Sequence, residues 1–219
     1  MEHDLVSLLT QLITKHVPSP LVVGIVGCPG AGKSTLASIL ALQLESQGIS
    51  CLVVPMDGFH LYKHQLAVMS DPALAFKRRG SPWTFDPQTL VIKLRLVLER
   101  NQVVKFPSFD HSKGDPVEDD IVFDPKRHKV VLVEGNYLLL KSDPEWAPIA
   151  ELLHHKLFLD VPEVVLRKRL EERHMEAWRI SREEAISRIE TNDLLNARLI
   201  VETKMYADQV ISPFSELSD

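Results

Sequence analysis

Residues 21–44 read LVVGIVGCPGAGKSTLASILALQL, an apolar run that breaks into a glycine-rich loop and then resumes with helical spacing. Residues 27–34 satisfy the pattern G-x-x-x-x-G-K-[ST], whose backbone amides encircle phosphate oxygens. The pattern requires a strand before the loop and a helix after it, and the flanking apolar runs predict both. This context disfavours a chance match in a glycine-rich loop. The stretch therefore predicts a nucleotide phosphate site.

Each part of this loop has a physical task. The lysine places a charge near the β and γ phosphates, and the hydroxyl that follows it is positioned to bind Mg²⁺. The start of the helix adds unpaired N–H groups and a positive dipole end. We expect the nucleotide to be held by Gly27, Cys28, Pro29, Gly30, Ala31, Gly32, Lys33, Ser34 and Thr35.

Composition limits the class of protein. The 219 residues are 45% hydrophobic and 25% charged, as in ordinary globular proteins. A net charge of −5 argues against nucleic acid as the main partner. No apolar run approaches the ~20 residues that a membrane helix needs, and the start MEHD has no basic region typical of a secretory signal. Two cysteines make no disulfide framework, so we expect a cytoplasmic protein.

The pattern of elements predicts an α/β fold. Strands are expected at 21–26, 51–55, 103–106, 130–133, 156–159 and 209–211, and helices at 5–13, from the phosphate loop to about 47, from 86 to 98, at 162–175 and at 181–197. The first helix should end before the prolines at 18 and 20. Residues 57–86 are polar, and 107–128 form either a long polar loop or a β-ribbon.

Strands alternating with helices indicate a three-layer, doubly wound, mostly parallel sheet that binds ligand at the carboxyl ends of its strands. We expect residues 1–219 to form a single domain. A lid is expected around 162–180 and an acceptor-site excursion around 107–128.

Polar clusters follow two of the strands. Asp57 comes after the second strand, where it can accept the proton of a substrate hydroxyl that attacks the γ-phosphate. The alternative is a turn former beside Gly58. Glu134 ends a run that reads as a buried strand, and a carboxylate there can hold Mg²⁺ directly or through water. A third cluster, FPSFDH at 106–111, brings a histidine next to an aspartate and an aromatic residue.

Basic residues form two further groups. Arg169 and Arg173 are four apart and share a helix face, whereas Arg167 points elsewhere in a regular helix. On a mobile helix these charges would close over the triphosphate and exclude water. The alternative is a set of solvated ion pairs with neighbouring glutamates. Residues 77–79, KRR, also have two interpretations, as an anion-binding loop or as a solvated face.

The chain resembles the phosphoribulokinase, uridine kinase and pantothenate kinase family over roughly residues 20–212. The strings that carry the resemblance are GCPGAGKST, MDGFH, FPSFDH, DVPEVVLRKRLEER, TND and YADQVIS. The combination with RRGSPWTFD and VEGNYLL is most similar to a bacterial branch labelled fructose transport system kinase or nucleoside triphosphate hydrolase domain protein.

The resemblance implies a P-loop NTPase fold of the nucleoside-kinase-like type, with residues 1–219 as a single P-loop kinase domain, and it implies roles for particular residues. It implies that Asp57 is the catalytic base and that 162–180 is an arginine-bearing lid. Residues expected at the acceptor substrate are Asp57, His60, Arg79, Phe109, His111, Tyr137, Arg167 and Asn192. Phe109 stands where uridine and pantothenate kinases tend to have tyrosine, which leaves the acceptor open.

The expected function is ATP- and Mg²⁺-dependent phosphorylation of a hydroxyl of a small polar metabolite. Lys33, Asp57, Arg169 and Arg173 are the expected catalytic residues, with Ser34 and Glu134 at the metal. The rival is an accessory ATPase without an acceptor. A GTPase switch should carry an N-K-x-D motif, and no asparagine here begins one. The oligomeric state stays open, with a homodimer as one alternative.

Overall fold

The computed structural model describes residues 2–15 and 20–212, and its centre is a sheet of five parallel strands. The strand order is β2 (Cys51–Pro55), β5 (Val130–Gly135), β1 (Leu21–Gly27), β6 (His155–Leu159) and β7 (Gln209–Ile211). Every residue of β1 and β5 is buried, which explains their continuous apolar sequences. The predicted parallel α/β sheet is confirmed.

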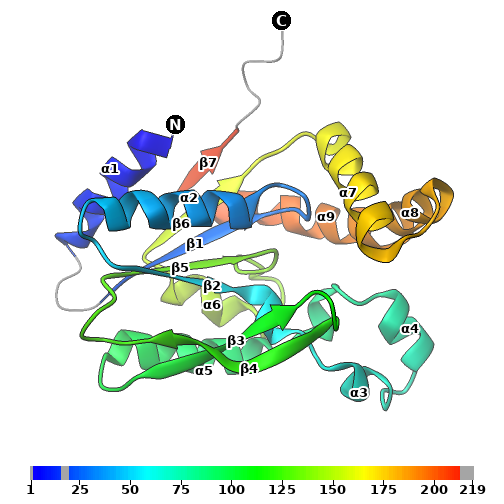
Figure 1. The fold of residues 1–219 in the computed structure, drawn as a ribbon, viewed down its shortest axis with the longest axis horizontal. Coiled ribbons are helices and arrows are strands. Elements are labelled where there is room, and N and C mark those ends of the chain that lie inside the picture. The colour runs from blue at the N-terminus through cyan, green and yellow to red at the C-terminus, as the bar shows by residue number, and fades with distance from the viewer. Residues whose placement is uncertain (1, 16–19, 213–219) are drawn as a thin grey trace, which may run out of the picture.

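Helices cover both faces of the sheet. The described helices of four or more residues are α1 (Glu2–Ile13), α2 (Lys33–Ser46), α3 (Lys63–Leu66), α4 (Pro72–Lys77), α5 (Pro87–Glu99), α6 (Ala147–Leu152), α7 (Glu163–Trp178), α8 (Arg182–Arg188) and α9 (Leu194–Glu202), with the 3₁₀ turns η1 (Met56–Phe59) and η4 (Thr203–Tyr206). A shorter 3₁₀ turn, η2, spans Pro82–Thr84. Helices α1 and α2 lie on one side of the sheet and α5 and α6 on the other (Figure 1). Among the described residues, no helix has the length and apolar character needed to cross a bilayer.

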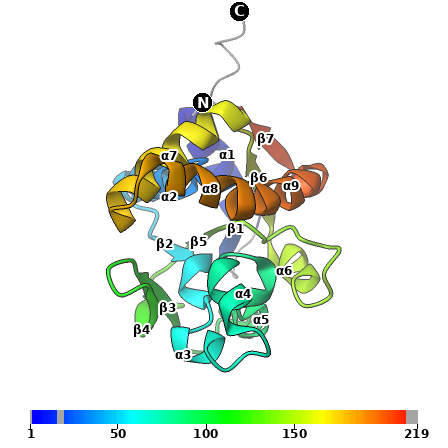
Figure 2. The ribbon, with the colours of Figure 1, turned by 90° about the vertical axis from the view of Figure 1, so that its right-hand side faces the viewer.

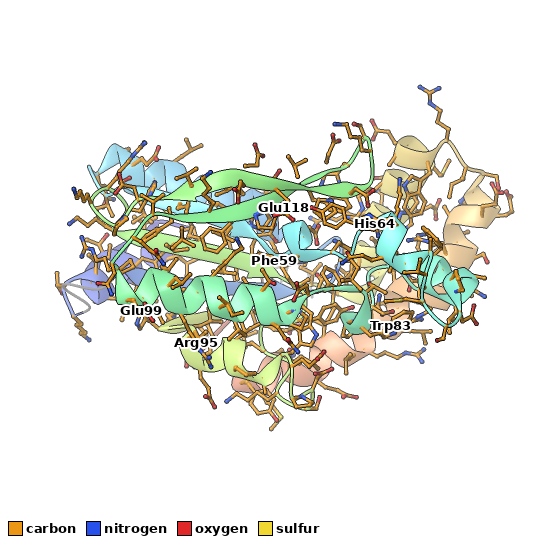
Figure 3. The ribbon with its side chains drawn as sticks, turned by 90° about the horizontal axis from the view of Figure 1, so that it is seen from below. Phe59, His64, Trp83, Arg95, Glu99 and Glu118 are labelled. Carbon is orange, nitrogen blue, oxygen red and sulfur yellow. The ribbon has the colours of Figure 1, made fainter. Side chains whose placement is uncertain are left out.

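The segment after α5 forms an antiparallel ribbon, which decides between the two readings of residues 107–128. Strand β3 (Val104–Asp110) extends beyond the predicted 103–106 and pairs with β4 (Asp115–Phe123). The ribbon packs closely on η1, where a Cβ on Gly58 would collide with the carbonyl oxygen of Pro107. Seen from below, α5 runs beside the ribbon, and its Arg95 and Glu99 are exposed (Figure 3).

Two helical predictions need correction. The helix expected at 181–197 is interrupted by a π-helical turn, η3 (Ile189–Asp193), between α8 and α9. The polar segment 57–86 holds short helices, and α6 was not predicted, because such short elements depend on tertiary contacts. Residues 18 and 19 of the predicted break after α1 lie outside the described residues.

Candidate active site

A cavity of about 1160 Å³ opens at the carboxyl ends of the parallel strands. Its wall includes residues 29–35 of the phosphate loop, Asp57 of η1, the tip of the ribbon, and part of α7 and η3. Ligand cavities in proteins usually measure about 300–1,000 Å³, so this one has room for a nucleotide and a second small molecule.

The phosphate loop has the backbone that its sequence predicts. Gly30 and Gly32 have φ of 81° and 95°, in the left-handed region that favours glycine. Gly32 is the N-cap of α2, so the first amides of that helix face the loop. Gly27 and Cys28 are not on the cavity wall but underneath it, where a Cβ on Gly27 would lie 2.9 Å from the Leu159 carbonyl oxygen. The loop is thus shaped to receive phosphate oxygens.

Lys33 is buried in this loop. Its Nζ donates to Asn136 Oδ1 at 2.8 Å and to the Cys28 carbonyl oxygen at 3.1 Å. Burial lowers the pKa of Lys33, while the carboxylates of Glu134 and Asp57 favour its charged form. An anionic ligand beside Nζ would stabilise that charge further.

Ser34 and Glu134 meet at the next position. Ser34 Oγ donates to Glu134 Oε1 at 2.9 Å. Burial raises the pKa of Glu134, and the charge of Lys33 opposes this. No group of three or more metal-ligating side chains exists among the described residues. One hydroxyl and one carboxylate suit Mg²⁺, which usually takes its other ligands from phosphates and water.

Asp57 and His60 reach the same cavity from the segment after β2. Asp57 belongs to η1, directly after β2, and lines the cavity near the charges of Lys33 and Glu134. His60 Nδ1 donates to the Asp57 carbonyl oxygen at 2.9 Å, so its Nε2 is the acceptor in the neutral ring. Desolvation lowers the pKa of His60, whose ring packs 3.9 Å from that of Phe85.

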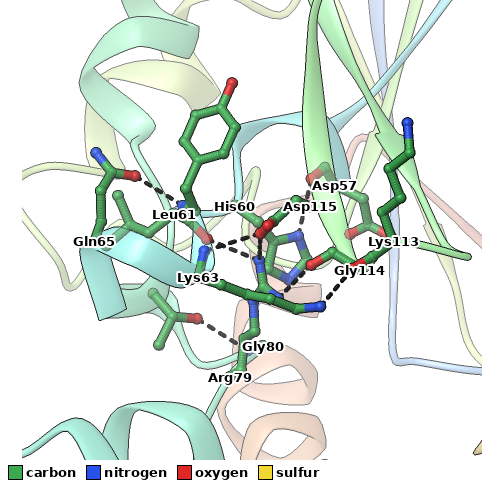
Figure 4. A network of polar contacts seen from close by, with 12 residues as sticks. Asp57, His60, Leu61, Lys63, Gln65, Arg79, Gly80, Lys113, Gly114 and Asp115 are labelled. Atoms are coloured by element: carbon green, nitrogen blue, oxygen red, sulfur yellow. Dashed lines mark hydrogen bonds and ion pairs between the residues drawn. The ribbon is translucent and has the colours of Figure 1, made fainter. Parts of the chain in front are cut away.

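Arg79 organises the far end of the cavity. Its guanidinium donates to the carbonyl oxygens of Leu61 and Gly114 and pairs with Asp115 at 3.0 Å (Figure 4). It also lies over the Phe109 ring. The ring of His111 packs 5.2 Å from that of Phe109, and all three predicted residues line the cavity. Arg79 therefore ties the ribbon tip to the segment after η1 instead of pointing freely at a ligand.

The lid arginines behave differently from one another. Arg169 and Arg173 both line the cavity, as their shared face predicts, and Arg169 Nη1 donates to the Gly30 carbonyl oxygen at 3.0 Å. Arg167 does not line it, and instead pairs with Glu163 at 2.7 Å and Glu190 at 3.7 Å. The regular helix turns Arg167 away from the phosphate loop.

Tyr137 is the other predicted substrate residue that lies off the cavity wall. Its side chain is fully buried, packs edge-on against Phe85 and Trp146, and donates from its hydroxyl to the Gly80 carbonyl oxygen at 2.6 Å. Asn192 does line the cavity, and its Nδ2 donates to the Arg79 carbonyl oxygen at 3.1 Å.

Comparison with known proteins gives the family. A Schizosaccharomyces pombe protein provisionally named uridine kinase C227.14 is 37% identical over 195 residues, which are 87% of this chain and 82% of that protein. The ATP-dependent kinase-like protein notR′ of Aspergillus versicolor is 38% identical over 161 residues, covering 71% of this chain and 92% of that one. The chain belongs to the phosphoribulokinase and uridine kinase family of P-loop kinases.

A solved structure supports this membership. A protein of Silicibacter sp. TM1040, provisionally named a fructose transport system kinase, has a TM-score of 0.83 and 32% identity, covering 94% of this chain and 98% of that chain. The family model of the methylmalonyl-CoA mutase-associated GTPase MeaB matches only residues 2–64. That match spans the phosphate loop but less than a third of the chain, so the P-loop kinase family accounts for far more of the molecule.

In this member of the P-loop kinase family, several cavity residues were not predicted from the sequence. They are Lys63, His174, Trp178, Arg188 and Asp193, together with Asn136, which holds Lys33. Asn136 comes two residues after the strand-end carboxylate Glu134, and among these six residues only its position in the sequence indicated a place in the site. His174, Trp178, Arg188 and Asp193 come together through the packing of α7 on α8 and η3 (Figure 2). Lys63 reaches the cavity from α3.

Proposed function

We propose that this chain transfers the γ-phosphoryl group of ATP, with Mg²⁺, to a hydroxyl of a small polar metabolite such as a sugar, a nucleoside or a pantothenate-like alcohol. The observation that supports this most is that Asp57 and the phosphate loop line one cavity, whose volume leaves room beside a nucleotide. Kinase names among the close relatives agree with this chemistry.

The phosphate loop and Lys33 would hold the phosphates, and Ser34 with Glu134 would hold Mg²⁺, which neutralises charge on the phosphates when bound. Asp57 would take the proton of the acceptor hydroxyl as its oxygen forms a bond to the γ-phosphorus. The bond from that phosphorus to the bridging oxygen breaks, and ADP leaves. Arg169 and Arg173 would stabilise the charge that moves to the bridging oxygen.

The lid and the acceptor pocket belong to the same proposal. Helix α7 would close the cavity over the phosphates, and the ribbon tip with Phe109 and His111 would border the acceptor. Closure excludes water, which would otherwise compete with the acceptor hydroxyl. A nucleotide site without an acceptor pocket has no need of such a wall.

The test is ADP formation by purified protein with ATP and Mg²⁺, alone and with separate pools of sugars, nucleosides and pantothenate-like alcohols. We expect one pool to raise turnover several-fold and Asp57→Asn to abolish that increase. Equal ATP turnover in every pool would contradict a metabolite kinase and favour the accessory ATPase.

A further inference from the structure

A buried polar pair joins the lid helix to the π-helical turn. His174 of α7 and Asp193 of η3 are both less than 10% exposed, and His174 Nε2 lies 2.8 Å from Asp193 Oδ2. Since a carboxylate oxygen only accepts, Nε2 carries the proton and donates. Unlike Arg169 and Arg173, neither residue of this pair has a part in the phosphoryl transfer proposed above.

The second half of α7 depends on this contact. Leu166, near the start of the helix, belongs to the main hydrophobic core, whereas Leu170 packs in a small separate cluster with Ile189 and Leu194. The rest of the helix is highly charged. Its C-terminal half is held to the protein by Leu170 in this cluster, by the buried pair of His174 with Asp193, and by two contacts to α8, from Glu171 to Arg182 and from Trp178 to Arg188.

The turn that carries Asp193 is fixed in its own right. Arg78 donates to the Thr191 carbonyl oxygen at 3.0 Å and to Asn196 Oδ1 at 3.0 Å, and Asn192 donates to the Arg79 carbonyl oxygen. These bonds join the turn to the wall that we assign to the acceptor. A π-helical turn within a helix often occurs at a functional site.

We propose that Asp193 is a positioning residue for the lid arginines, an inference that rests on the proposed function. The hydrogen bond between Asp193 and His174 sets the rotation of α7. Arg173, which directly precedes His174 on that helix, then faces the phosphate end of the cavity. The bond thereby links the side of the cavity that holds the phosphates to the wall that borders the acceptor.

Trp178 provides a reporter on the same helix. Its ring stacks on His174 with centroids 4.7 Å apart, and the Arg188 guanidinium lies 4.0 Å from its centre. A change in the seating of α7 should therefore change Trp178 emission. Trp83 and Trp146 lie on other elements and also emit. The part of the emission change that disappears in the Trp178→Phe variant is therefore the part that comes from Trp178.

The experiment measures binding of the non-hydrolysable analogue AMP-PNP and of ADP, each with Mg²⁺, by calorimetry and by Trp178 emission. The variants are Asp193→Ala, His174→Ala, their double and Asp193→Asn, which keeps an oxygen that can accept from His174. The matched control is Glu190→Ala, because Glu190 lies on the same turn, is exposed and pairs only with Arg167 among the described ion pairs.

If Asp193 positions the lid, Asp193→Ala weakens AMP-PNP binding about tenfold or more and ADP binding much less, because the missing contact is to the outer phosphate. His174→Ala has the same effect, the double variant adds nothing further, Asp193→Asn restores most of the affinity, and Glu190→Ala matches wild type. The AMP-PNP-dependent change of Trp178 emission is lost with the affinity.

Other results overturn the proposal. Equal weakening of both nucleotides, or additive effects of the two alanine substitutions, would mean a general structural role. If Asp193→Ala does not fold, a double variant with His174→Leu and Asp193→Leu replaces both buried polar groups by apolar ones. Wild-type AMP-PNP affinity in that double variant contradicts the proposal. Wild-type protein that binds neither nucleotide would instead refute the proposed function, and the inference with it.

Discussion

Ser34 Oγ donates to Glu134 Oε1 across 2.9 Å, although the two residues are one hundred positions apart in the sequence. Parallel pairing of β1 with β5 creates this contact. Ser34 lies at the start of the helix that follows β1, and Glu134 lies near the end of β5. A hydroxyl and a carboxylate so placed suit Mg²⁺ beside a bound triphosphate, either as direct ligands or through water.

Glu134→Gln should raise the Mg²⁺ concentration needed for half-maximal ATP turnover about tenfold or more. Loss of a group that holds a metal ion or orients its ligands usually lowers metal affinity by ~10–100-fold. The amide keeps a hydrogen bond to Ser34, so thermal stability should change little. An unchanged Mg²⁺ requirement in titrations at saturating ATP would remove Glu134 from the metal site.

Lys33→Met should lower ATP turnover by about 10²-fold or more, because the charge beside the phosphates is lost. The protein should still fold, because the substitution removes the desolvation cost of the buried ammonium together with its two hydrogen bonds, to Asn136 and to the Cys28 carbonyl oxygen. Near-native turnover would contradict the phosphate-loop assignment.

Asp57→Asn should leave AMP-PNP affinity unchanged, because the carboxylate is assigned to the acceptor and not to the nucleotide. Transfer to the acceptor should fall by ~10²-fold or more, the usual scale for a positioned general base. Lost nucleotide affinity with normal turnover of bound ATP would assign Asp57 to the metal instead.

Arg169→Ala should lower kcat more than tenfold while raising the KM for ATP less, because the interaction is strongest in the transition state. Arg167→Ala is the matched control on the same helix, since its exposed pair with Glu163 contributes only ~0.2–1 kcal/mol to stability. Equal steady-state constants for the two variants would exclude a special role for Arg169.

His60 should make stability depend on pH. Its pKa is lowered on folding from 6.5, mainly by desolvation, so the folded state binds fewer protons than the unfolded state below that pH. The free energy of unfolding should therefore fall as pH drops below about 6.5, and His60→Asn should reduce this slope.

The difference between the urea unfolding curves of variant and wild type isolates the contribution of His60, because burial also lowers the pKa of His128 and His155. A parallel pH dependence in the two proteins would contradict the assignment.

The sequence predicted those parts of the site that depend on local chemistry. The phosphate loop and the strand ends that carry Asp57 and Glu134 follow from short patterns, and the helical spacing correctly set Arg167 apart from Arg169. In each case the residue's place is decided within a few positions along the chain.

The remaining residues depend on contacts between distant segments. His174 and Asp193 are nineteen positions apart and meet because the chain reverses after α7, so that α8 and η3 pack against that helix. Tyr137, three residues after Glu134, was predicted to contact the substrate, but it lies in the bend after β5 with its ring buried in the core against Trp146. Periodicity and motifs carry no information on such packing.

Label transfer from γ-³²P-ATP to an alcohol tests the central claim most directly. Purified wild-type protein with Mg²⁺ and the acceptor pools should yield a labelled phosphate monoester, identified by chromatography and mass spectrometry. Asp57→Asn should bind nucleotide equally and yield ~10²-fold less of that product. Label recovered only as inorganic phosphate, with every pool and in equal amount without any pool, would contradict the account.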